Sequence, residues 1–432
     1  MSSNHGNPRT QRAPRTTSRP QARTDSKQET QHAPQGKAKS KTQRAPQGAP
    51  RRVQRRVNLL NTFRQLTSAQ TISTLSTQIN VSRPAVERIV ADLDNLGWVK
   101  QLAPDNSFGR PATRWTLDAD TVHVLGLDIG AHHCTAMVCD LFGEVLSELT
   151  VDLDAKTPAK QRLLDATEAG CEAVKAADLS IEEITLCAVA SPGVVNEGVV
   201  TYYGGSGMPD WRGTDIAQEV SGVLHCETVV AGDCALGALG ESWRGAAEGH
   251  DDVVYILSGE RTGGAAIING QIHRGLQGAA GLIGELSPIR WKDIEAETCA
   301  KRVYETDEIT SRTEIFNAAR TGDAKAVSVI EDFADALSLG AAAMVLTLAP
   351  SHLVVGGKYS AFSDLFLERF VNNLQHWCPV MPQVSASALG PRAICLGALR
   401  LGLDTLFEYL ENTALAGDVF PSAEGFKKQF QA

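Results

Sequence analysis

A short polar segment, SRPAVER at residues 82–88, carries side chains suited to reading nucleic acid bases. Its candidate contact residues are Ser82, Arg83, Glu87 and Arg88. Side chains at the N-terminal end of a recognition helix reach base edges in the DNA major groove. Arginine can bond guanine through two hydrogen bonds, and glutamate can accept one from a cytosine amine. The segment is therefore a candidate DNA-reading surface, provided that a helix begins there.

The surrounding pattern predicts three helices. Apolar residues recur at three- and four-residue spacing from Arg51 to Leu66 and again from 72 to 79, as on the buried face of a helix. Residues 80–82 then form a turn. Ser82 is a favourable N-cap and Pro84 suits a first helical turn, so a third helix is expected to run to about Asn95.

Two strands are expected after the third helix, at 98–103 and 113–117, joined by a polar loop. Three helices followed by a hairpin outline a winged helix-turn-helix over residues 51–118. Arg55 and Arg56 on the first helix are expected to contact phosphates, which position a protein without specifying sequence. Arg110 at the hairpin tip suits a narrow, A·T-rich minor groove. The alternative for Arg110 is a solvated loop cation.

Charge is strongly segregated along the chain. Residues 1–52 hold 12 Lys/Arg and 2 Asp/Glu, and residues 53–117 hold 8 and 4, whereas residues 118–432 hold 21 and 44. A basic front and an acidic body indicate that only the front approaches a polyanion. The pattern favours double-stranded DNA as partner of the front, although a winged helix can also bind protein.

Residues 1–50 are expected to be a disordered basic tail, because they are repetitive and have almost no large apolar side chain. The tail either adds salt-sensitive DNA affinity or merely aids solubility. There is no apolar stretch long enough for a membrane span and no N-terminal apolar leader, so a cytoplasmic protein is expected. The 9 cysteines are scattered without paired spacing, which predicts buried thiols and no metal site.

From residue 122 onward, strands alternate with helices. Apolar strand patterns occur at 122–130, 134–141, 184–191, 228–233, 253–259 and 352–357, a hairpin turn is expected at Asn269-Gly270, and helices are expected near 158–177 and 325–348. This order predicts an α/β architecture with helices on the sheet faces.

Several landmarks in this part resemble the ROK family, named for repressors, open reading frames and sugar kinases. They are LDIG at 127–130, ASPGVVNEGVV at 190–200, MPDWRGTDIAQEV at 208–220, GDCALGALGESWRGAA at 232–247, INGQIHRGLQGAAGLIGEL at 268–286, LAPSHLVVGG at 348–357 and LGALRLGL at 396–403. The resemblance implies a two-lobed actin-like ATPase fold over 122–432, with a winged helix-turn-helix in front as in the family's regulators.

The same resemblance allows a check of the parts that kinase members use. The first phosphate loop has His132 and His133 where a small hydroxyl residue is expected, and the second has Glu260 where nucleotide charge would lie. Asp233 keeps the position of the general base, but Gly232 replaces its partner amide. These departures predict that the chain is not an enzyme.

The sugar-contacting motif departs as well. Leu282 stands in place of a sugar-binding glutamate, and Glu285 in place of a histidine that also binds zinc. The expected cysteine-rich zinc loop is absent, since residues 286–302 hold only Cys299. No cofactor and no metal are expected, and a non-sugar effector such as an amino-acid or sulfur metabolite comes into question.

The remaining cleft is a candidate effector site. Its candidate residues are Asp233, Glu285, Trp211, His132 and Arg261. The alternative is that Asp233 is a satisfied buried carboxylate and Glu285 a solvated loop residue.

The sequence thus predicts a cytoplasmic, ligand-responsive transcriptional regulator, acting as a homodimer or homotetramer on a palindromic operator. The competing interpretations are an active sugar kinase with an accessory DNA-binding arm and a regulator without any effector. Repression and activation are not distinguished.

Overall fold

The computed structural model describes residues 51–103, 113–294, 312–417 and 419–431. The first described part holds helices α1 (Arg51–Gln65), α2 (Ile72–Ile79) and α3 (Arg83–Asn95). A small sheet of order β1-β3-β2 accompanies them, formed by β1 (Gln70–Thr71), β2 (Val99–Leu102) and β3 (Arg114–Leu117). All three helices and both longer strands lie within a residue or two of the expected ranges.

The ends of these helices follow from local chemistry. Thr71 caps α2 by accepting a hydrogen bond from the Thr74 amide, and Asn80 ends it in the left-handed conformation. Ser82 occupies the expected N-cap position of α3. Its side chain, however, makes no capping hydrogen bond. Gly97, with φ of 77°, allows the turn from α3 into β2.

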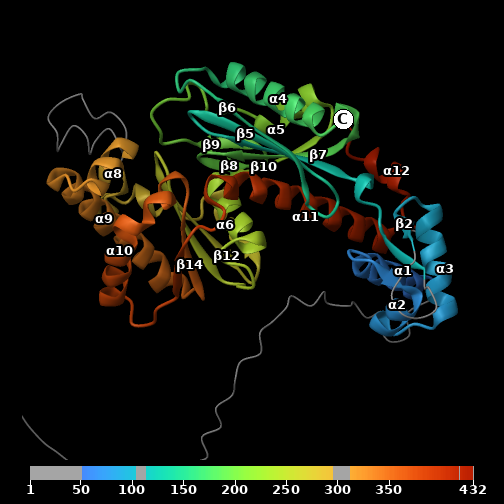
Figure 1. The fold of residues 1–432 in the computed structure, drawn as a ribbon. Coiled ribbons are helices and arrows are strands. Elements are labelled where there is room, and N and C mark those ends of the chain that lie inside the picture. Colours follow the sequence, from blue (N-terminus) through green and yellow to red (C-terminus); the bar gives the residue numbers. More distant parts are fainter. Residues whose placement is uncertain (1–50, 104–112, 295–311, 418, 432) are drawn as a thin grey trace, which may run out of the picture. The chain divides into compact units, whose positions relative to one another are not determined.

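Two five-stranded sheets follow, each the centre of one lobe (Figure 1). The first-lobe sheet has the order β10-β7-β4-β5-β6. Its strands are β4 (His123–Ile129), β5 (His133–Cys139), β6 (Val145–Asp152), β7 (Ile184–Ser191) and β10 (Glu227–Gly232). A separate two-stranded ribbon pairs β8 (Val194–Asn196) with β9 (Val199–Tyr202).

The second-lobe sheet has the order β13-β12-β11-β14-β15. Its strands are β11 (Val253–Ser258), β12 (Thr262–Ile268), β13 (Gln271–Ile272), β14 (His352–Gly356) and β15 (Gln383–Ala386). In each sheet three consecutive strands pair antiparallel, and two further strands then join in parallel. The two lobes therefore repeat one topology.

Helices cover both faces of the first-lobe sheet. Helices α4 (Ala159–Ala176) and α5 (Ile216–Leu224) pack on one face, and α11 (Ala393–Ala416) packs on the other against β4 and β7. The strands β4 and β7 are buried along their whole length, as expected for strands covered on both sides.

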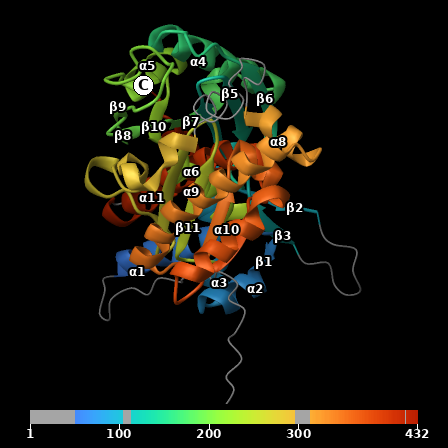
Figure 2. The ribbon, with the colours of Figure 1, turned by 90° about the vertical axis from the view of Figure 1, so that its left-hand side faces the viewer.

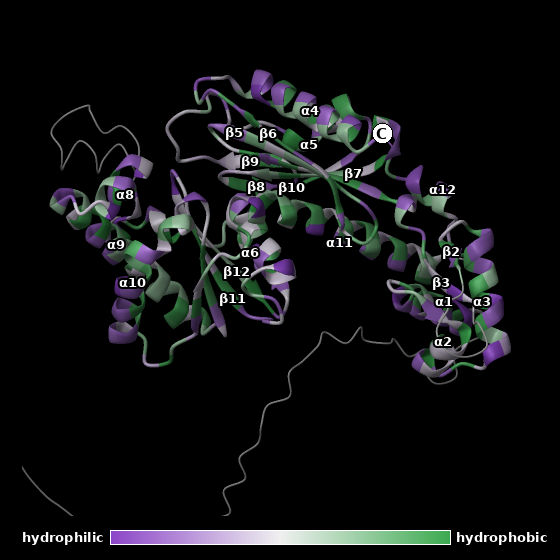
Figure 3. Ribbon diagram, in the orientation of Figure 1, coloured by the Kyte–Doolittle hydropathy of each residue, from purple (hydrophilic) through white to green (hydrophobic). Residues whose placement is uncertain are grey.

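In the second lobe, α6 (Asp233–Arg244) lies against β11 and β12 and also packs on α11. Helices α8 (Arg312–Arg320), α9 (Ala324–Leu348) and α10 (Ser363–Trp377) also belong to this lobe (Figure 2). Figure 3 shows the strands of the second-lobe sheet to be largely hydrophobic and α10 to carry many hydrophilic residues. Because α6 packs on the second-lobe sheet and α11 on the first-lobe sheet, the contact between these two helices connects the two sheets.

The chain ends in a short helix, α12 (Ala423–Lys427), that packs against the segment after α3. The Ala423 amide donates to the Leu96 carbonyl over 2.9 Å, and the Trp98 indole donates to the Pro421 carbonyl over 2.8 Å. The rings of Trp98 and Phe426 meet edge to face with centroids 5.4 Å apart. Among the described helices, none is long and apolar enough to cross a membrane.

Candidate functional site

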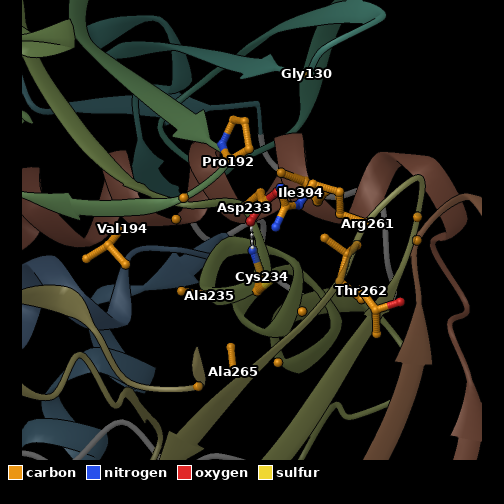
Figure 4. Close-up of a pocket in the computed structure, with 18 of the residues that line it drawn as sticks. Gly130, Pro192, Val194, Asp233, Cys234, Ala235, Arg261, Thr262, Ala265 and Ile394 are labelled. Atoms are coloured by element: carbon orange, nitrogen blue, oxygen red, sulfur yellow. Dashed lines mark hydrogen bonds between the residues drawn. The ribbon is translucent and has the colours of Figure 1, made fainter. Parts of the chain in front are cut away.

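A cavity of about 330 Å³ lies where residues of both lobes meet. Its walls come from the β4–β5 turn, the start of β8, the start of α6, the β11–β12 turn and the segment 278–285 (Figure 4). The volume is within the range of natural small-molecule pockets. The carboxyl ends of β4, β7 and β10 all reach this cavity, as expected for a ligand site in an α/β sheet.

The β4–β5 turn is held from behind by a buried arginine. The Arg162 guanidinium on α4 donates to the carbonyls of Gly130, Ala131 and Asp154 over 2.7, 3.0 and 2.6 Å. Next to the turn, His133 Nε2 on β5 lies 3.4 Å from Asp128 Oδ2 on β4, and this hydrogen bond raises the pKa of His133 against the effect of burial. One wall of the cavity is thus a turn flanked by a histidine–carboxylate pair.

Asp233 begins helix α6 and faces the cavity (Figure 4). Its Oδ1 accepts a hydrogen bond from the Cys234 amide over 2.7 Å. Desolvation raises the pKa of Asp233 to about 6, with Asp128 adding to the rise, while the Cys234 amide and Arg261 oppose it. A carboxyl titrating near neutral pH in a cavity is a candidate functional group.

Glu285 also lines the cavity, and its charge is already balanced. Lys292 Nζ lies 2.6 Å from Glu285 Oε2, and Tyr202 on the first lobe hydrogen-bonds the same carboxylate. The hydrogen bond from Lys292 lowers the pKa of Glu285, which outweighs its partial desolvation. Glu285 is therefore ion-paired within the second lobe, contacts Tyr202 of the first, and also lines the cavity.

Glu260 on the β11–β12 turn is balanced in the same way. Lys358 Nζ and Tyr359 Oη donate to Glu260 Oε1 over 2.8 and 2.9 Å. Burial alone would raise the pKa of Glu260, but Lys358 and Tyr359 together lower it. The turn itself is fastened by Arg312, which donates to the Gly259 carbonyl over 2.6 Å.

Arg261 extends from that turn into the cavity toward Asp233 (Figure 4). Its guanidinium lies over the Tyr203 ring, 5.8 Å from the centroid. A Cβ atom added to Gly204 or Gly205 would lie 3.3 or 2.7 Å from a guanidinium nitrogen, so these glycines leave room for the arginine. Arg261 thus reaches across from the second lobe to the first.

The structure places two expected cleft residues differently. Trp211 does not line the cavity: it is fully buried in the first-lobe core, and its indole donates to Ser191 Oγ over 3.1 Å. The expectation that Trp211 lies at the cleft mouth is therefore corrected. His132 does line the cavity, but its exposed side chain contrasts with that of His133, which bonds Asp128.

The candidate DNA-contacting residues lie on α1 and α3. Ser82, Arg83, Glu87 and Arg88 are all exposed on the first two turns of α3, whereas Val86 between them is buried. The Arg88 guanidinium donates to the carbonyl of Pro84 over 3.2 Å. The interior face of α3 is thus separate from the face that carries these polar residues.

The two arginines of α1 make contacts inside the protein. Arg55 lies 2.7 Å from Asp92 on α3, with most of its side chain exposed, and Arg56 donates to the Leu415 carbonyl over 3.2 Å. Arg110 lies outside the described residues. The Arg56 side chain is therefore partly occupied by its contact with α11, whereas most of the Arg55 side chain is exposed to solvent.

Several cavity residues were not identified from the sequence. They are Asp128, His133, Tyr202, Tyr203, Lys292 and Lys358. Asp128 lies in the LDIG motif and His133 shortly after it, and the resemblance of this segment to a phosphate loop was the signal that could have identified them. Lys292 and Lys358 become cavity residues only through pairing with Glu285 and Glu260, which lie 7 and 98 positions away. In the described part of the chain, no group of three or more metal-binding side chains comes together.

Comparison with known proteins identifies relatives of two kinds. The chain is similar to a xylose repressor from Caldicellulosiruptor bescii, with 22% identity over 374 residues that span 78% of this chain and 92% of the repressor. It is also similar to a glucokinase from Streptomyces coelicolor, with 26% identity over 64% of this chain and 96% of that enzyme.

The similar solved structures are of the same two kinds, regulators and sugar kinases. One is a ROK family transcriptional regulator described as a homologue of the E. coli MLC protein, with a TM-score of 0.65 and 19% identity, covering 84% of this chain and 99% of that one. Another is a ROK family glucokinase from Streptomyces griseus in complex with glucose and AMPPNP, with a TM-score of 0.57 and 25% identity, covering 65% of this chain and 99% of that one.

The family model for ROK proteins matches residues 124–404, which is well over half of the chain and includes both sheets and the cavity. These matches confirm the resemblance seen in the sequence and the mixed α/β, actin-like fold of the two lobes. The protein belongs to the ROK family.

Proposed function

We propose that this protein is a DNA-binding transcriptional regulator whose ROK cleft senses a small molecule. In this proposal residues 51–118 form a winged helix-turn-helix domain, residues 1–50 a basic tail, and residues 122–432 the sensing and oligomerisation domain. The cleft has become a binding site and does not transfer phosphate.

The observation that carries the proposal is how far each kind of relative extends along the chain. Matches to xylose repressors reach 78% and 82% of this chain, whereas matches to Streptomyces glucokinases stop at 64% while spanning 96% of the enzyme. The solved regulator covers 84% of this chain and the glucokinase 65%. A segment of the length of α1–β3, in front of the part that the ROK family model matches, would account for this difference.

The geometry of that segment supports DNA binding. Helix α3 presents Arg83, Glu87 and Arg88 on an exposed face, and its buried face packs on α1 and α2. This is the arrangement in which a recognition helix lies in the major groove. The basic charge of residues 1–117 favours the same orientation toward a polyanion.

The cavity supports loss of phosphoryl transfer. Glu260 lies in the turn that corresponds to the second phosphate loop, and Gly232 provides no side-chain amide beside Asp233. A carboxylate beside a bound nucleotide would repel its phosphates, even when Lys358 balances part of its charge. Binding can still be retained in such a site.

A homodimer or tetramer would place two copies of α3 on a palindromic, A·T-rich operator. An effector in the cleft would act by binding one arrangement of the two lobes more tightly than the other, because only differential affinity shifts a conformational equilibrium. The effector proposed here is a metabolite other than a neutral sugar.

The first experiment is genome-wide footprinting with the full-length protein, followed by anisotropy titration on the recovered site. We expect Arg83→Ala to cost about 1–3 kcal/mol and to relax the sequence preference at one position. Arg320→Ala, which removes an exposed cation paired with Asp364 in the second lobe, is the matched control and should leave DNA affinity unchanged. Absence of any protected site would contradict the proposal.

A sugar kinase with an accessory DNA-binding arm is the second candidate, supported by the glucokinase relatives and by Asp233 at the cavity wall. A coupled ATP-consumption assay over a panel of sugars decides between the two. Turnover that is lost in Asp233→Asn would establish the kinase, and we expect none above background.

A further inference from the structure

Among the described residues that line it, the cavity of the ROK domain holds as many Lys/Arg as Asp/Glu side chains, but the ion pairs among them leave two arginines without a paired carboxylate. Its acidic residues are Asp128, Asp233, Glu260 and Glu285. Glu260 is paired with Lys358 at 2.8 Å, Glu285 with Lys292 at 2.6 Å, and Asp128 lies 3.4 Å from His133. Asp233 is the one acid of this set without such a cationic partner in the residues that the structure describes.

Two arginines also line the cavity. Within the described ranges, Arg261 and Arg274 have no carboxylate at ion-pair distance, and both line the cavity. Arg274 is exposed at its rim, while Arg261 lies deeper and extends toward Asp233 (Figure 4). An unpaired guanidinium in a cavity favours an anionic ligand, because partial desolvation strengthens charge-assisted hydrogen bonds.

We propose that the cleft binds a small organic acid whose oxyanion group is held by Arg261 and whose neighbouring hydroxyl or ammonium group donates to Asp233. The proposal deepens the function put forward above, since this acid would be the effector. The class includes hydroxy and sugar acids, amino acids and sugar phosphates, which share an oxyanion beside a hydrogen-bond donor.

The surroundings of Arg261 preorganise it for this role. Its guanidinium lies over the Tyr203 ring at 5.8 Å and beside Gly204 and Gly205, where there is no side chain to displace it. A guanidinium held by a ring keeps its planar donors available for a carboxylate or phosphate. Less conformational entropy is then lost when the anion binds.

The rest of the cavity disfavours a neutral sugar. Leu282, Val194 and Ile272 present apolar surface to it. Glu285, which could accept from a sugar hydroxyl, already accepts from Lys292 and Tyr202. A polyhydroxylated neutral ligand would leave hydroxyl groups facing apolar side chains, which costs affinity.

The test measures the melting temperature of the full-length protein with matched pairs of ligands. The pairs are gluconate with glucose, alanine with alaninamide, and glucose 6-phosphate with glucose, and the second compound of each pair lacks the oxyanion. A ligand selective for the folded state raises the melting temperature. We expect at least one acid to raise it and its counterpart without the oxyanion not to; the arm that responds identifies the source of the oxyanion.

Calorimetry of the responding acid then tests the residue. Arg261→Gln should weaken binding by at least about tenfold, as expected for the loss of a charge-assisted contact. Arg261→Lys should keep part of the affinity, and Arg212→Gln, an exposed arginine that does not line the cavity, should keep all of it. Equal effects of an acid and its counterpart without the oxyanion, no response to any acid, or unchanged affinity in Arg261→Gln would overturn the inference.

DNA binding by the same preparations separates this inference from the proposed function. DNA footprints without binding of any acid would support the proposed regulator and contradict the anionic effector. Binding of an acid without any DNA footprint would support the ligand class and contradict the proposed regulator.

Discussion

The pKa values of the carboxyl groups in the cavity are shifted in different directions because these groups have different partners. Lys292 and Lys358 lower the pKa of Glu285 and Glu260, whereas desolvation without a paired cation raises the pKa of Asp233 to about 6. Of these three acids, Glu285 and Glu260 are parts of ion pairs, whereas Asp233 has no cation at ion-pair distance among the described residues.

A stability prediction follows for Asp233. A raised pKa in the folded state means that the fold holds the proton more tightly than the unfolded chain, so stability falls as pH rises from about 4 to above 6. Asp233→Asn should remove this cost. We expect it to raise the free energy of unfolding at pH 7.5 by about 1–2 kcal/mol, which allows for contact with water in the cavity.

Urea unfolding at pH 7.5 and pH 4 measures this effect. Most of the gain should disappear at pH 4, where the carboxyl is protonated in the folded state and about half protonated in the unfolded chain. The groups acting on Asp233 are Asp128, Cys234 and Arg261, and all stay in place in the variant. Asp251→Asn, at an exposed position, is the control and should change stability little at either pH. A gain independent of pH would contradict the assignment.

At the scale of elements, the close packing of α6 on α11 joins the two lobes. A Cβ added to Gly397 on α11 would lie 1.8 Å from the Leu236 carbonyl oxygen, and one added to Gly240 on α6 would lie 2.1 Å from the Ala393 carbonyl oxygen. Each glycine therefore allows the backbone of one helix to touch the other. The helix that begins at Asp233 is positioned by this contact.

Gly397→Ala should therefore be strongly destabilising, by about 1–3 kcal/mol or more, because a helix backbone cannot yield as a side chain can. Gly222→Ala is the matched control: Gly222 lies within α5, and an added Cβ meets nothing within 4 Å. That substitution should stabilise by up to about 1 kcal/mol through helix propensity. Thermal or urea unfolding compares the two, and equal effects would show that the contact is not tight.

The C-terminal helix α12 shows what local patterns do not reveal. It has only 5 residues, too few for a helical periodicity, and was not expected. Its place depends on Trp98 and Phe426, which are separated by more than 300 residues yet have ring centroids 5.4 Å apart. In contrast, α3 and α9 were expected almost to the residue, because both have long apolar periodicity.

At the scale of the whole molecule, the separation of charge supports the proposal that the N-terminal end approaches DNA. Residues 1–50 carry 10 Lys/Arg against 2 Asp/Glu. Each phosphate contact made by such cations steepens the dependence of affinity on salt, by about 0.9 in the logarithmic slope. The cations of this tail would therefore add to the affinity of the proposed DNA complex.

Deletion of residues 1–50 should therefore lower DNA affinity at low salt and reduce the salt slope by at least about one. Anisotropy titrations on one operator between low and high salt measure both quantities. Sequence preference, which depends on α3, should be unchanged. An unchanged slope would show that the tail only aids solubility.

The sequence alone determined the order of helices and strands, the charge division and the family, because these depend on local periodicity, composition and ordered motifs. It also singled out Asp233, Glu285 and Arg261. Only the tertiary structure decided what surrounds each of them. Lys292 and Tyr202 occupy Glu285, Trp211 belongs to the core, and Arg261 faces the cavity beside Asp233. Such pairings join residues distant in the chain, and ion-pair energies depend on separations in space, which no local pattern encodes.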